Sequence, residues 1–409
     1  MGKSACRFFI FIVIATFIYW MWSNCASRNQ QIMTEDYEIM YQRLQFEYEK
    51  KQANGMKYVL IWTLPNTDPL MYLGQGQDRF IKRNCKNAKC FISTDRSLFD
   101  SITHFDVVVF SIKEIVEKKV TDLPIIRSPH QKYVFASSES SDYYPLCDDR
   151  FDTYFNVTWT YKLNSDISYG YIVVRNNEGE VIGPKEVMHW KAISDMDSIN
   201  DTLKIKLKSK RLAAAWFVSN CNAPSDRDTF VKKLRNELKK FNMDVDIYGS
   251  CGTKKCPRQS MASCLQSVER DYYFYLSFEN SFSEDYVTEK LLHGLQHYAV
   301  PIVYGAANYS RFMPDGIYLN ARELGPQKLA ERMHEIINDK EQYYNFFRWH
   351  KYYSFHQTEE DPETDIYCKF CEKMNDIEYM RKSTVLEHVR KWWNPKNVRT
   401  KVCPIRWTG

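Results

Sequence analysis

The sequence predicts an α/β protein with two domains, each built on a parallel sheet, and a cleft between them where a ligand would bind. Short runs of β-branched and aromatic residues alternate with polar stretches of helix length, which is typical of buried parallel strands joined by helices. A polar, lysine-rich stretch at 191–211 interrupts this alternation, which then restarts. A chain of 409 residues is long enough for two or three domains.

The predicted elements follow in order along the chain. Strands are expected in the first half at 58–62, 105–110 and 132–137, and in the second half at 212–218, 245–249, 272–278 and 299–305. Asp226 is expected to cap a helix that carries apolar residues at helical spacing, and Thr288 to cap another that ends near 298. We therefore place an N-terminal domain at 57–200, a C-terminal domain at 201–380 and a C-terminal tail at 381–409.

The N-terminal segment is predicted to insert into a membrane. Residues 8–22 contain no charge and follow Lys3 and Arg7. A cleaved signal peptide is the alternative, but the aromatic residues near Trp22 favour an uncleaved anchor. Because basic residues stay cytosolic, we expect a type II protein with a cytoplasmic tail at 1–7 and a lumenal remainder. So short a span favours the Golgi or the endoplasmic reticulum, and we predict a Golgi membrane.

Residues 23–56 form the predicted stem. They are polar, and tyrosine, methionine and leucine residues recur at helical spacing between 37 and 48. Such a helix could join two copies of the chain in a homodimer, and a solvated single helix is equally consistent with the pattern.

Cysteines and glycosylation sequons agree with a lumenal chain. Ten of the twelve cysteines lie beyond the anchor and the stem, and disulfides are favoured over zinc because the Cys368–Cys371 pair lacks a second ligand pair. Which cysteines pair stays open. Three sequons give candidate glycosylation sites at Asn156, Asn200 and Asn308.

Charge excludes one class of partner. The net charge of +5 is too small for a nucleic-acid-binding protein. The lysine-rich run at 204–211 is interpreted as a solvated linker. Two Asp-x-Asp strings, at 195–197 and 244–246, have a form that can bind a divalent metal, but we interpret neither as a metal site.

Two helix starts carry cations beside the end of a predicted strand. Lys290 lies in the first turn of the helix after 288, and Arg227 in the first turn of the helix after 226. Exposed amides at a helix start attract anions, and the planar fork of arginine suits a diphosphate. Each residue could instead be an ordinary surface cation.

These segments carry a family resemblance. The loop FENS (278–281) is followed by DYVTEK (285–290) and AVPIVYGA (299–306), a pattern that resembles the donor-binding signature of the α1,3-fucosyltransferases. The resemblance extends to WFVSNC (216–221), VDIYGSCG (245–252), FRWH (347–350) and the CxxC at 368, and so covers about residues 57–380.

The resemblance implies a GT-B fold, which has two Rossmann-like domains facing a cleft, and GDP-fucose bound by the C-terminal domain. Arg227 and Lys290 would contact the diphosphate. Asn280, Tyr286 and Glu289 would hold the nucleotide and the fucose. No cofactor would be obligatory, and Mn²⁺ or Mg²⁺ could stimulate the reaction without being essential.

Glu139 is the candidate general base. It follows the predicted strand at 132–137, as a glutamate does in the family, and an inverting transfer needs a carboxylate to take the acceptor proton. The family continues Glu-Ser-Pro, whereas this chain has Ser141 in place of proline, so the loop is expected to be freer. A second block at 156–171 also departs from the family, with Val157 for Trp, Lys162 for Arg and Asn164 for Asp.

The function predicted is transfer of L-fucose from GDP-β-L-fucose to the 3-hydroxyl of N-acetylglucosamine in a glycoprotein glycan, with inversion. The alternative is a membrane-anchored glycan-binding protein that keeps the fold without turnover, which the departures at 156–171 would explain. A GT-B enzyme for another nucleotide sugar is disfavoured by the FENS-to-TEK spacing. The acceptor, either the N-glycan core or a lactosamine antenna, is left open by the sequence.

Overall fold

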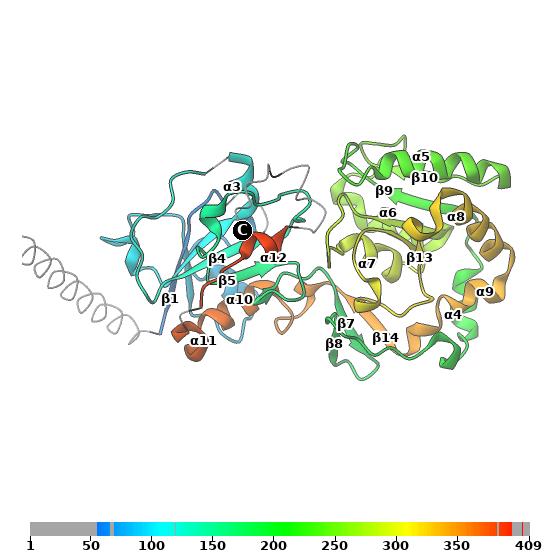
Figure 1. Ribbon diagram of the computed structural model, residues 1–409. Coiled ribbons are helices and arrows are strands. Elements are labelled where there is room, and N and C mark those ends of the chain that lie inside the picture. Colours follow the sequence, from blue (N-terminus) through cyan, green and yellow to red (C-terminus); the bar gives the residue numbers. More distant parts are fainter. Residues whose placement is uncertain (1–54, 66–68, 119, 383, 395–402, 404–409) are drawn as a thin grey trace, which may run out of the picture.

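Parallel sheets form the core of both halves of the chain, as predicted. The computed structural model describes residues 55–65, 69–118, 120–382, 384–394 and 403 (Figure 1). Within those ranges, no helix has both the length and the apolar character needed to cross a membrane. The expected anchor at 8–22 and nearly all of the expected stem at 23–56 lie outside the described residues.

The first lobe is built on a six-stranded parallel sheet whose strands have the order β2-β1-β3-β4-β5-β6. Its strands are β1 (Lys57–Ile61), β2 (Cys90–Ser93), β3 (Val107–Ser111), β4 (Lys132–Ser137), β5 (Val157–Thr160) and β6 (Ile167–Ser168). Every residue of β3 and β4 is buried, because helices cover both faces of a parallel sheet. The helices of this lobe are α2 (Asp78–Lys82), α3 (Ile112–Lys118), α10 (Ile366–Met374), α11 (Ile377–Arg381) and α12 (Val389–Trp393), with short 3-10 turns at η1 (Leu70–Tyr72), η2 (Ile102–His104) and η3 (Asp149–Phe151).

The second lobe repeats this architecture with a five-stranded parallel sheet of order β10-β9-β11-β12-β13. Its strands are β9 (Leu212–Phe217), β10 (Val245–Tyr248), β11 (Tyr272–Phe278), β12 (Val300–Tyr304) and β13 (Leu319–Asn320). Its helices are α4 (Asp201–Leu207), α5 (Arg227–Leu238), α6 (Met261–Asp271), α7 (Glu289–Gln296), α8 (Ala321–Asn338) and α9 (Lys340–Asn345). The apolar face of α5 packs against β9, as its spacing predicts, while α6 covers the opposite face of the sheet.

A third, small sheet is antiparallel and separate from these two, and its strands have the order β14-β7-β8. It consists of β7 (Val173–Asn176), β8 (Val181–Gly183) and β14 (Tyr353–His356), and so joins segments far apart in the sequence. The remaining 3-10 turns are η4 (Ile193–Asp195), η5 (Lys239–Phe241), η6 (Arg258–Ser260), η7 (Tyr309–Arg311), η8 (Arg348–Lys351) and η9 (Thr358–Glu360).

The end of the chain returns to the first lobe (Figure 1). Residues of α10 and α11 pack into the same core as β1, β3 and β4, and Trp393 of α12 packs on the opposite face of that sheet. Our assignment of 366–380 to the C-terminal domain was therefore wrong, and 384–394 is part of a core rather than a tail. Burial of large apolar side chains such as Phe370 and Trp393, both fully inaccessible, accounts for the return.

Five disulfides use all ten cysteines that follow the predicted stem. Both cysteines of the CxxC bond to the first lobe, in the pairs Cys85–Cys368 and Cys90–Cys371. The other pairs are Cys147–Cys403, Cys221–Cys251 and Cys256–Cys264. The preference for disulfides over zinc is confirmed, and the first two pairs fix the returning segment covalently to the first sheet.

The predicted linker at 204–211 was wrong in part. Residues 201–207 form α4, in which Leu207 is buried, and Lys210 is only 4% exposed with its ammonium donating to the Val268 carbonyl at 3.3 Å. Burial lowers the pKa of Lys210 from its ordinary value to about 7. The alternating lysines favoured a solvated segment, but Lys210 packs against the start of the second sheet.

Candidate active site

The ends of β9 and β11 form the position in the second sheet where strand order reverses. Strand β9 pairs with β10 on one side and with β11 on the other, so the chain leaves these two strands in opposite directions. In open parallel sheets ligands bind outside the carboxyl ends of the strands at such a position. FENS follows β11, and WFVSNC spans the end of β9, so both predicted donor segments meet there.

Arg227 joins the two strand ends. Its guanidinium donates to the Phe278 carbonyl at 2.6 Å and to the Asn220 carbonyl at 3.2 Å. Arg227 is 3% exposed, and its buried Nε has no hydrogen-bond partner among the described residues. Burial lowers the pKa of Arg227, while the charge of Glu279 opposes this change. The residue is thus a buried cation at the predicted anion site, held by backbone carbonyls.

The helix start at Arg227 differs in detail from the prediction. Asp226 precedes the helix, but its backbone has a positive φ of 52°, and its side chain makes no capping hydrogen bond. Thr288 also makes no side-chain cap for α7. Its hydroxyl oxygen accepts from the Lys290 ammonium at 2.6 Å, while its hydroxyl and its backbone N–H donate to the Glu279 carboxylate at 3.0 and 2.9 Å. The hydroxyl that we expected to cap α7 is therefore engaged by the side chains of Lys290 and Glu279.

Lys290 lies between one buried carboxylate and one exposed carboxylate. Its ammonium is 3.1 Å from Glu279, whose side chain is 2% exposed, and 3.2 Å from Glu289, whose side chain is 48% exposed. Burial disfavours the charged ammonium, but the two carboxylates outweigh burial and raise the pKa of Lys290. Burial also works against ionisation of Glu289, yet the adjacent Lys290 lowers the pKa of Glu289 to about 2. Lys290 and Glu289 are both charged at neutral pH.

Glu279 is the residue of this site that the sequence analysis missed. Its carboxylate is buried, and burial raises its pKa, although the ion pair with Lys290 opposes that effect. The signal was present in the sequence, because Glu279 is the only charged residue within the FENS motif and directly follows a buried strand. Of the FENS motif, we had considered only Asn280 as a site residue. The neighbouring Asn280 is half-buried, and its side-chain oxygen accepts from the Ser281 hydroxyl at 2.8 Å.

Glu139 faces this site from the first lobe. It follows β4, and its carboxylate accepts a hydrogen bond of 3.1 Å from the Tyr286 hydroxyl of the second lobe. Burial raises the pKa of Tyr286 well above its ordinary value, and the charge of Glu139 adds to this effect, so the phenol remains a donor. The Tyr286 ring lies in the core of the first lobe, 4.9 Å from the ring of Tyr161. The structure therefore brings the candidate base and a candidate donor-binding residue into direct contact.

Serine side chains hold the Glu139 loop against the second lobe. The Ser140 and Ser281 hydroxyls are hydrogen bonded, and the Ser141 hydroxyl is 3.2 Å from that of Ser283. The Ser141 N–H donates to the Tyr161 hydroxyl at 3.0 Å, a bond that a proline could not make. Our expectation of a freer loop was wrong, because hydrogen bonds replace the rigidity of the ring.

The departures at 156–171 have partners in the returning segment. Lys162 donates to the Trp392 carbonyl at 2.5 Å, and Asn164 accepts from the Trp392 indole N–H at 3.1 Å. The Lys162 ammonium also lies 4.9 Å from the centroid of the Trp392 ring. These two side chains thus bind α12, and their identity is explained by packing.

The Asp-x-Asp strings have cationic partners. Asp244 pairs with Arg235 at 2.6 Å, Asp246 pairs with Lys254 at 3.0 Å, and Asp197 pairs with Lys351. Among the described residues, one cluster of potential metal ligands has its ligand atoms close enough together to hold an ion. It consists of Cys85, Asp365 and Cys368. The two cysteines of that group are bonded to each other, so they offer no thiolate.

Comparisons with known proteins identify the family of this chain. Residues 54–172 match the family description "Fucosyltransferase, N-terminal", and residues 207–392 match "Glycosyltransferase family 10 (fucosyltransferase) C-term". The α-(1,3)-fucosyltransferase C of Drosophila melanogaster is 31% identical over 363 residues, which are 87% of this chain and 82% of the fly protein. A 3-galactosyl-N-acetylglucosaminide 4-α-L-fucosyltransferase of Bos taurus is 32% identical over 297 residues, 71% of each chain.

Among solved structures, an α1,3-fucosyltransferase with GDP-fucose is 13% identical, with a TM-score of 0.45, and the match covers 78% of this chain and 90% of that one. The two family matches together span both lobes and include every candidate donor-binding residue and Glu139. The chain belongs to glycosyltransferase family 10, the fucosyltransferases.

Proposed function

We propose that this chain is an inverting α1,3-fucosyltransferase that moves L-fucose from GDP-β-L-fucose to the 3-hydroxyl of N-acetylglucosamine in a glycoprotein glycan. The observation that carries the proposal is the 3.1 Å hydrogen bond between Tyr286 and Glu139. It joins a carboxylate of the first lobe to the loop of the second lobe that leads into Glu289 and Lys290. A base and a cationic anion site thus face each other from two lobes, as a GT-B enzyme requires.

The donor would bind at the ends of β9 and β11. Lys290 and Arg227 supply positive charge for the diphosphate, and the N-terminal amides of α7 add partial positive charge. Asn280 and the exposed carboxylate of Glu289 are the proposed contacts to the nucleotide and the sugar hydroxyls. When the bond from the anomeric carbon to the phosphate oxygen breaks, these fixed cations stabilise the charge that develops on GDP.

Glu139 would act as the general base on the acceptor side. The acceptor oxygen forms the new bond to the anomeric carbon, its proton passes to the Glu139 carboxylate, and GDP leaves on the opposite face, which inverts the configuration. Tyr286 holds that carboxylate through its hydroxyl, so we assign it as a positioning residue for the base. Its assignment as a direct donor contact, which the family resemblance implies, is the competing role.

The location we propose is the Golgi membrane, with an anchor at 8–22 and both lobes in the lumen. Five disulfides support an oxidising compartment, because cytosolic proteins keep their thiols reduced. Neutralisation of the diphosphate by side chains makes a metal ion non-essential in this proposal, and Mn²⁺ or Mg²⁺ could stimulate turnover. Association through the stem into a homodimer belongs to the same proposal.

The experiment that tests the function is transfer from labelled GDP-fucose by the full chain in detergent. The acceptors are N-glycans with and without galactosylated antennae, each assayed with and without EDTA, and the linkage is read by fragmentation of the product. Glu139→Gln is expected to lower turnover by about 10²-fold or more while GDP-fucose still raises the melting temperature. Full activity of Glu139→Gln would contradict the base assignment. Thermal stabilisation of the unaltered chain without product on any acceptor would favour the glycan-binding alternative.

A further inference from the structure

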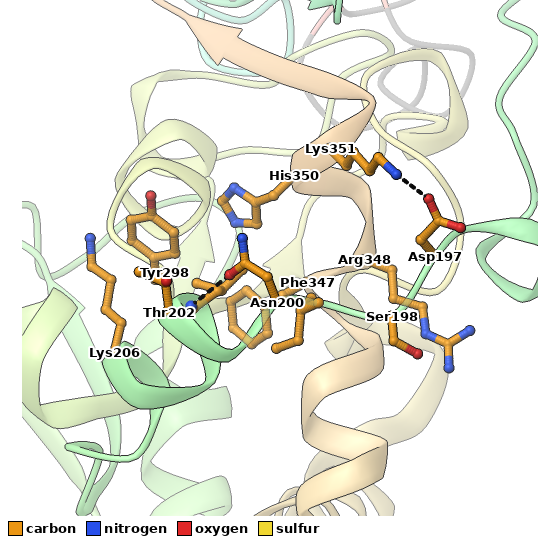
Figure 2. A pocket seen from close by; sticks show the side chains of 12 residues that line it. Asp197, Ser198, Asn200, Thr202, Lys206, Tyr298, Phe347, Arg348, His350 and Lys351 are labelled. Carbon is orange, nitrogen blue, oxygen red and sulfur yellow. Dashed lines mark hydrogen bonds and ion pairs between the residues drawn. The ribbon is translucent and has the colours of Figure 1, made fainter.

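The second lobe contains a cavity of about 690 Å³ that is separate from the candidate active site. It is lined by side chains from α4, from the segment between α7 and β12, and from η8 (Figure 2). Tyr298 stands just before β12, and Lys206 lies in the helix that precedes β9. The cavity is therefore at the edge of the sheet where strands begin, whereas the candidate donor site is at the edge where they end.

The cations of the cavity are already paired. Lys206 is 2.7 Å from Glu269, Lys351 pairs with Asp197, and Arg348 points its guanidinium at two backbone carbonyls at 3.4 and 3.5 Å. An anionic ligand would have to displace these partners. The charges of the lining thus favour a neutral ligand.

The remaining lining suits a ligand with both hydroxyl groups and apolar faces. His350 is stacked between Tyr298 and Trp349, with ring centroids 4.7 and 3.7 Å away. Its buried Nε2 has no hydrogen-bond partner within the described ranges. Burial lowers the pKa of His350 to about 3, so the ring is neutral and can donate or accept one hydrogen bond. Phe347 adds an apolar wall. A carbohydrate offers both kinds of surface.

A sugar attachment residue lies in the wall of this cavity. Asn200 belongs to a glycosylation sequon with Thr202, and both side chains are exposed. Its oxygen accepts from the Leu203 N–H at 2.9 Å and so caps α4. The nitrogen, to which a glycan attaches, is not used in the cap, and Figure 2 shows the amide directed toward His350.

The Lys206 ammonium lies 3.7 Å from the centroid of the Tyr298 ring, so the edges of Tyr298 and His350, and not their faces, are the surfaces left for a ligand. We propose that this cavity binds the chain's own N-glycan, whose first sugars extend from Asn200 along the edges of Tyr298 and His350. The inference rests on the lumenal location proposed above. A glycan at Asn200 keeps the cap on α4, because attachment leaves the side-chain oxygen free to accept. The glycan therefore acts as a structural part of the second lobe.

The other two sequons differ in ways that provide controls. Asn156 is 8% exposed, donates to the Thr384 carbonyl at 2.7 Å and accepts from the Tyr133 N–H at 2.8 Å, so the fold has no room for a glycan there. Asn308 is exposed and lies outside the cavity lining. We expect glycans at Asn200 and Asn308 and none at Asn156.

The first test compares two substitutions of Thr202 in full chains made in glycosylating cells. Thr202→Ala removes the sequon but keeps the Asn200 cap, and alanine favours an exposed helix position over threonine. Loss of a seated glycan should nevertheless lower the melting temperature by about 2 °C or more. Thr202→Ser keeps the sequon and should match the unaltered chain. A melting temperature of Thr202→Ala equal to or above that of Thr202→Ser overturns the proposal.

The second test measures release of each glycan from the native protein by a peptide N-glycosidase, followed by glycopeptide mass spectrometry. Seating in the cavity should slow release at Asn200 by about tenfold relative to Asn308, and Tyr298→Ala should remove the difference. Equal release at the two sites, or an unmodified Asn200 beside a modified Asn308, overturns the cavity proposal alone. No glycan at any sequon overturns it together with the lumenal location. Fucose transfer is assayed separately, so a sheltered Asn200 glycan without transfer would contradict only the proposed activity.

Discussion

Removal of one hydroxyl, in Tyr286→Phe, tests whether Tyr286 positions the base or binds the donor. The phenol donates to Glu139 at 3.1 Å, and a hydrogen bond to a charged group contributes about 1.5–3 kcal/mol. Because 3.1 Å is long for an O–H···O bond, we take the lower end, which corresponds to about a tenfold loss in kcat. The ring keeps its packing against Tyr161, so the fold should survive. The KM for GDP-fucose should change less than about twofold, since the lost bond acts on the acceptor side.

Steady-state kinetics at saturating acceptor, with GDP-fucose varied, provide the assay. Tyr171→Phe is the matched control, because it removes a hydroxyl that donates to the Ser138 carbonyl at 2.9 Å, next to Glu139 in sequence. A tenfold rise in the KM for GDP-fucose with kcat unchanged would refute the positioning role and assign Tyr286 to the donor. Equal losses of kcat in Tyr286→Phe and Tyr171→Phe would show that general loosening of the loop, and not the bond to Glu139, is responsible.

Three further predictions concern charge and covalent structure. Lys290→Ala should weaken GDP-fucose binding, measured by calorimetry, by about tenfold or more. It should also lower the melting temperature, because it leaves the buried Glu279 carboxylate without its cation. Unchanged affinity for GDP-fucose would place the diphosphate elsewhere. Between pH 7 and 10.5 the unfolded chain binds a proton at Lys210 more readily than the folded chain does. The free energy of unfolding, measured in urea melts, should therefore rise with pH by up to about 1.4 kcal/mol per pH unit. Lys210→Met should remove about 2 kcal/mol of the rise between pH 7 and 9. Replacement of both Cys90 and Cys371 by serine should cost about 2–4 kcal/mol of stability, and an unchanged denaturant midpoint would show that the second tether, Cys85–Cys368, is sufficient.

Local sequence patterns predicted most of the strands of the two parallel sheets, because such strands are largely buried on both faces. Strands β3, β9 and β11 consist of apolar or aromatic residues almost without interruption, and such short apolar runs between polar segments are typical of strands in a parallel sheet. The short strands were missed. Strand β6 has two residues and β13 has two, so their positions depend on neighbouring strands rather than on their own composition.

Long-range contacts set the parts of the site that the sequence could not predict. The polar run at 204–211 resembles a linker, and only its contact with α6 and the second sheet buries Lys210. Glu279 has the appearance of an ordinary loop carboxylate until Thr288 and Lys290 surround it. In each case the charge is tolerated because a partner from another element compensates for the loss of water, and such partners are not visible in a single sequence.

The contact between Glu139 and Tyr286 depends on the same kind of closure. Disulfides tie α10 to the first sheet, and α12 is held by Lys162 and Asn164, so the chain that leaves the second lobe is fixed on the first at several points. The two lobes are thereby joined by two crossings of the chain, the connection before β9 and the return after β14, which lie side by side where β7 pairs with β14. A displacement of about 1 Å at a reacting group can cost 10²-fold in rate, which explains why a base and its donor site on separate lobes would need such restraint. Motifs near one strand end can identify the donor half of this site, but its distance from the base is set by the residues that close the chain on itself.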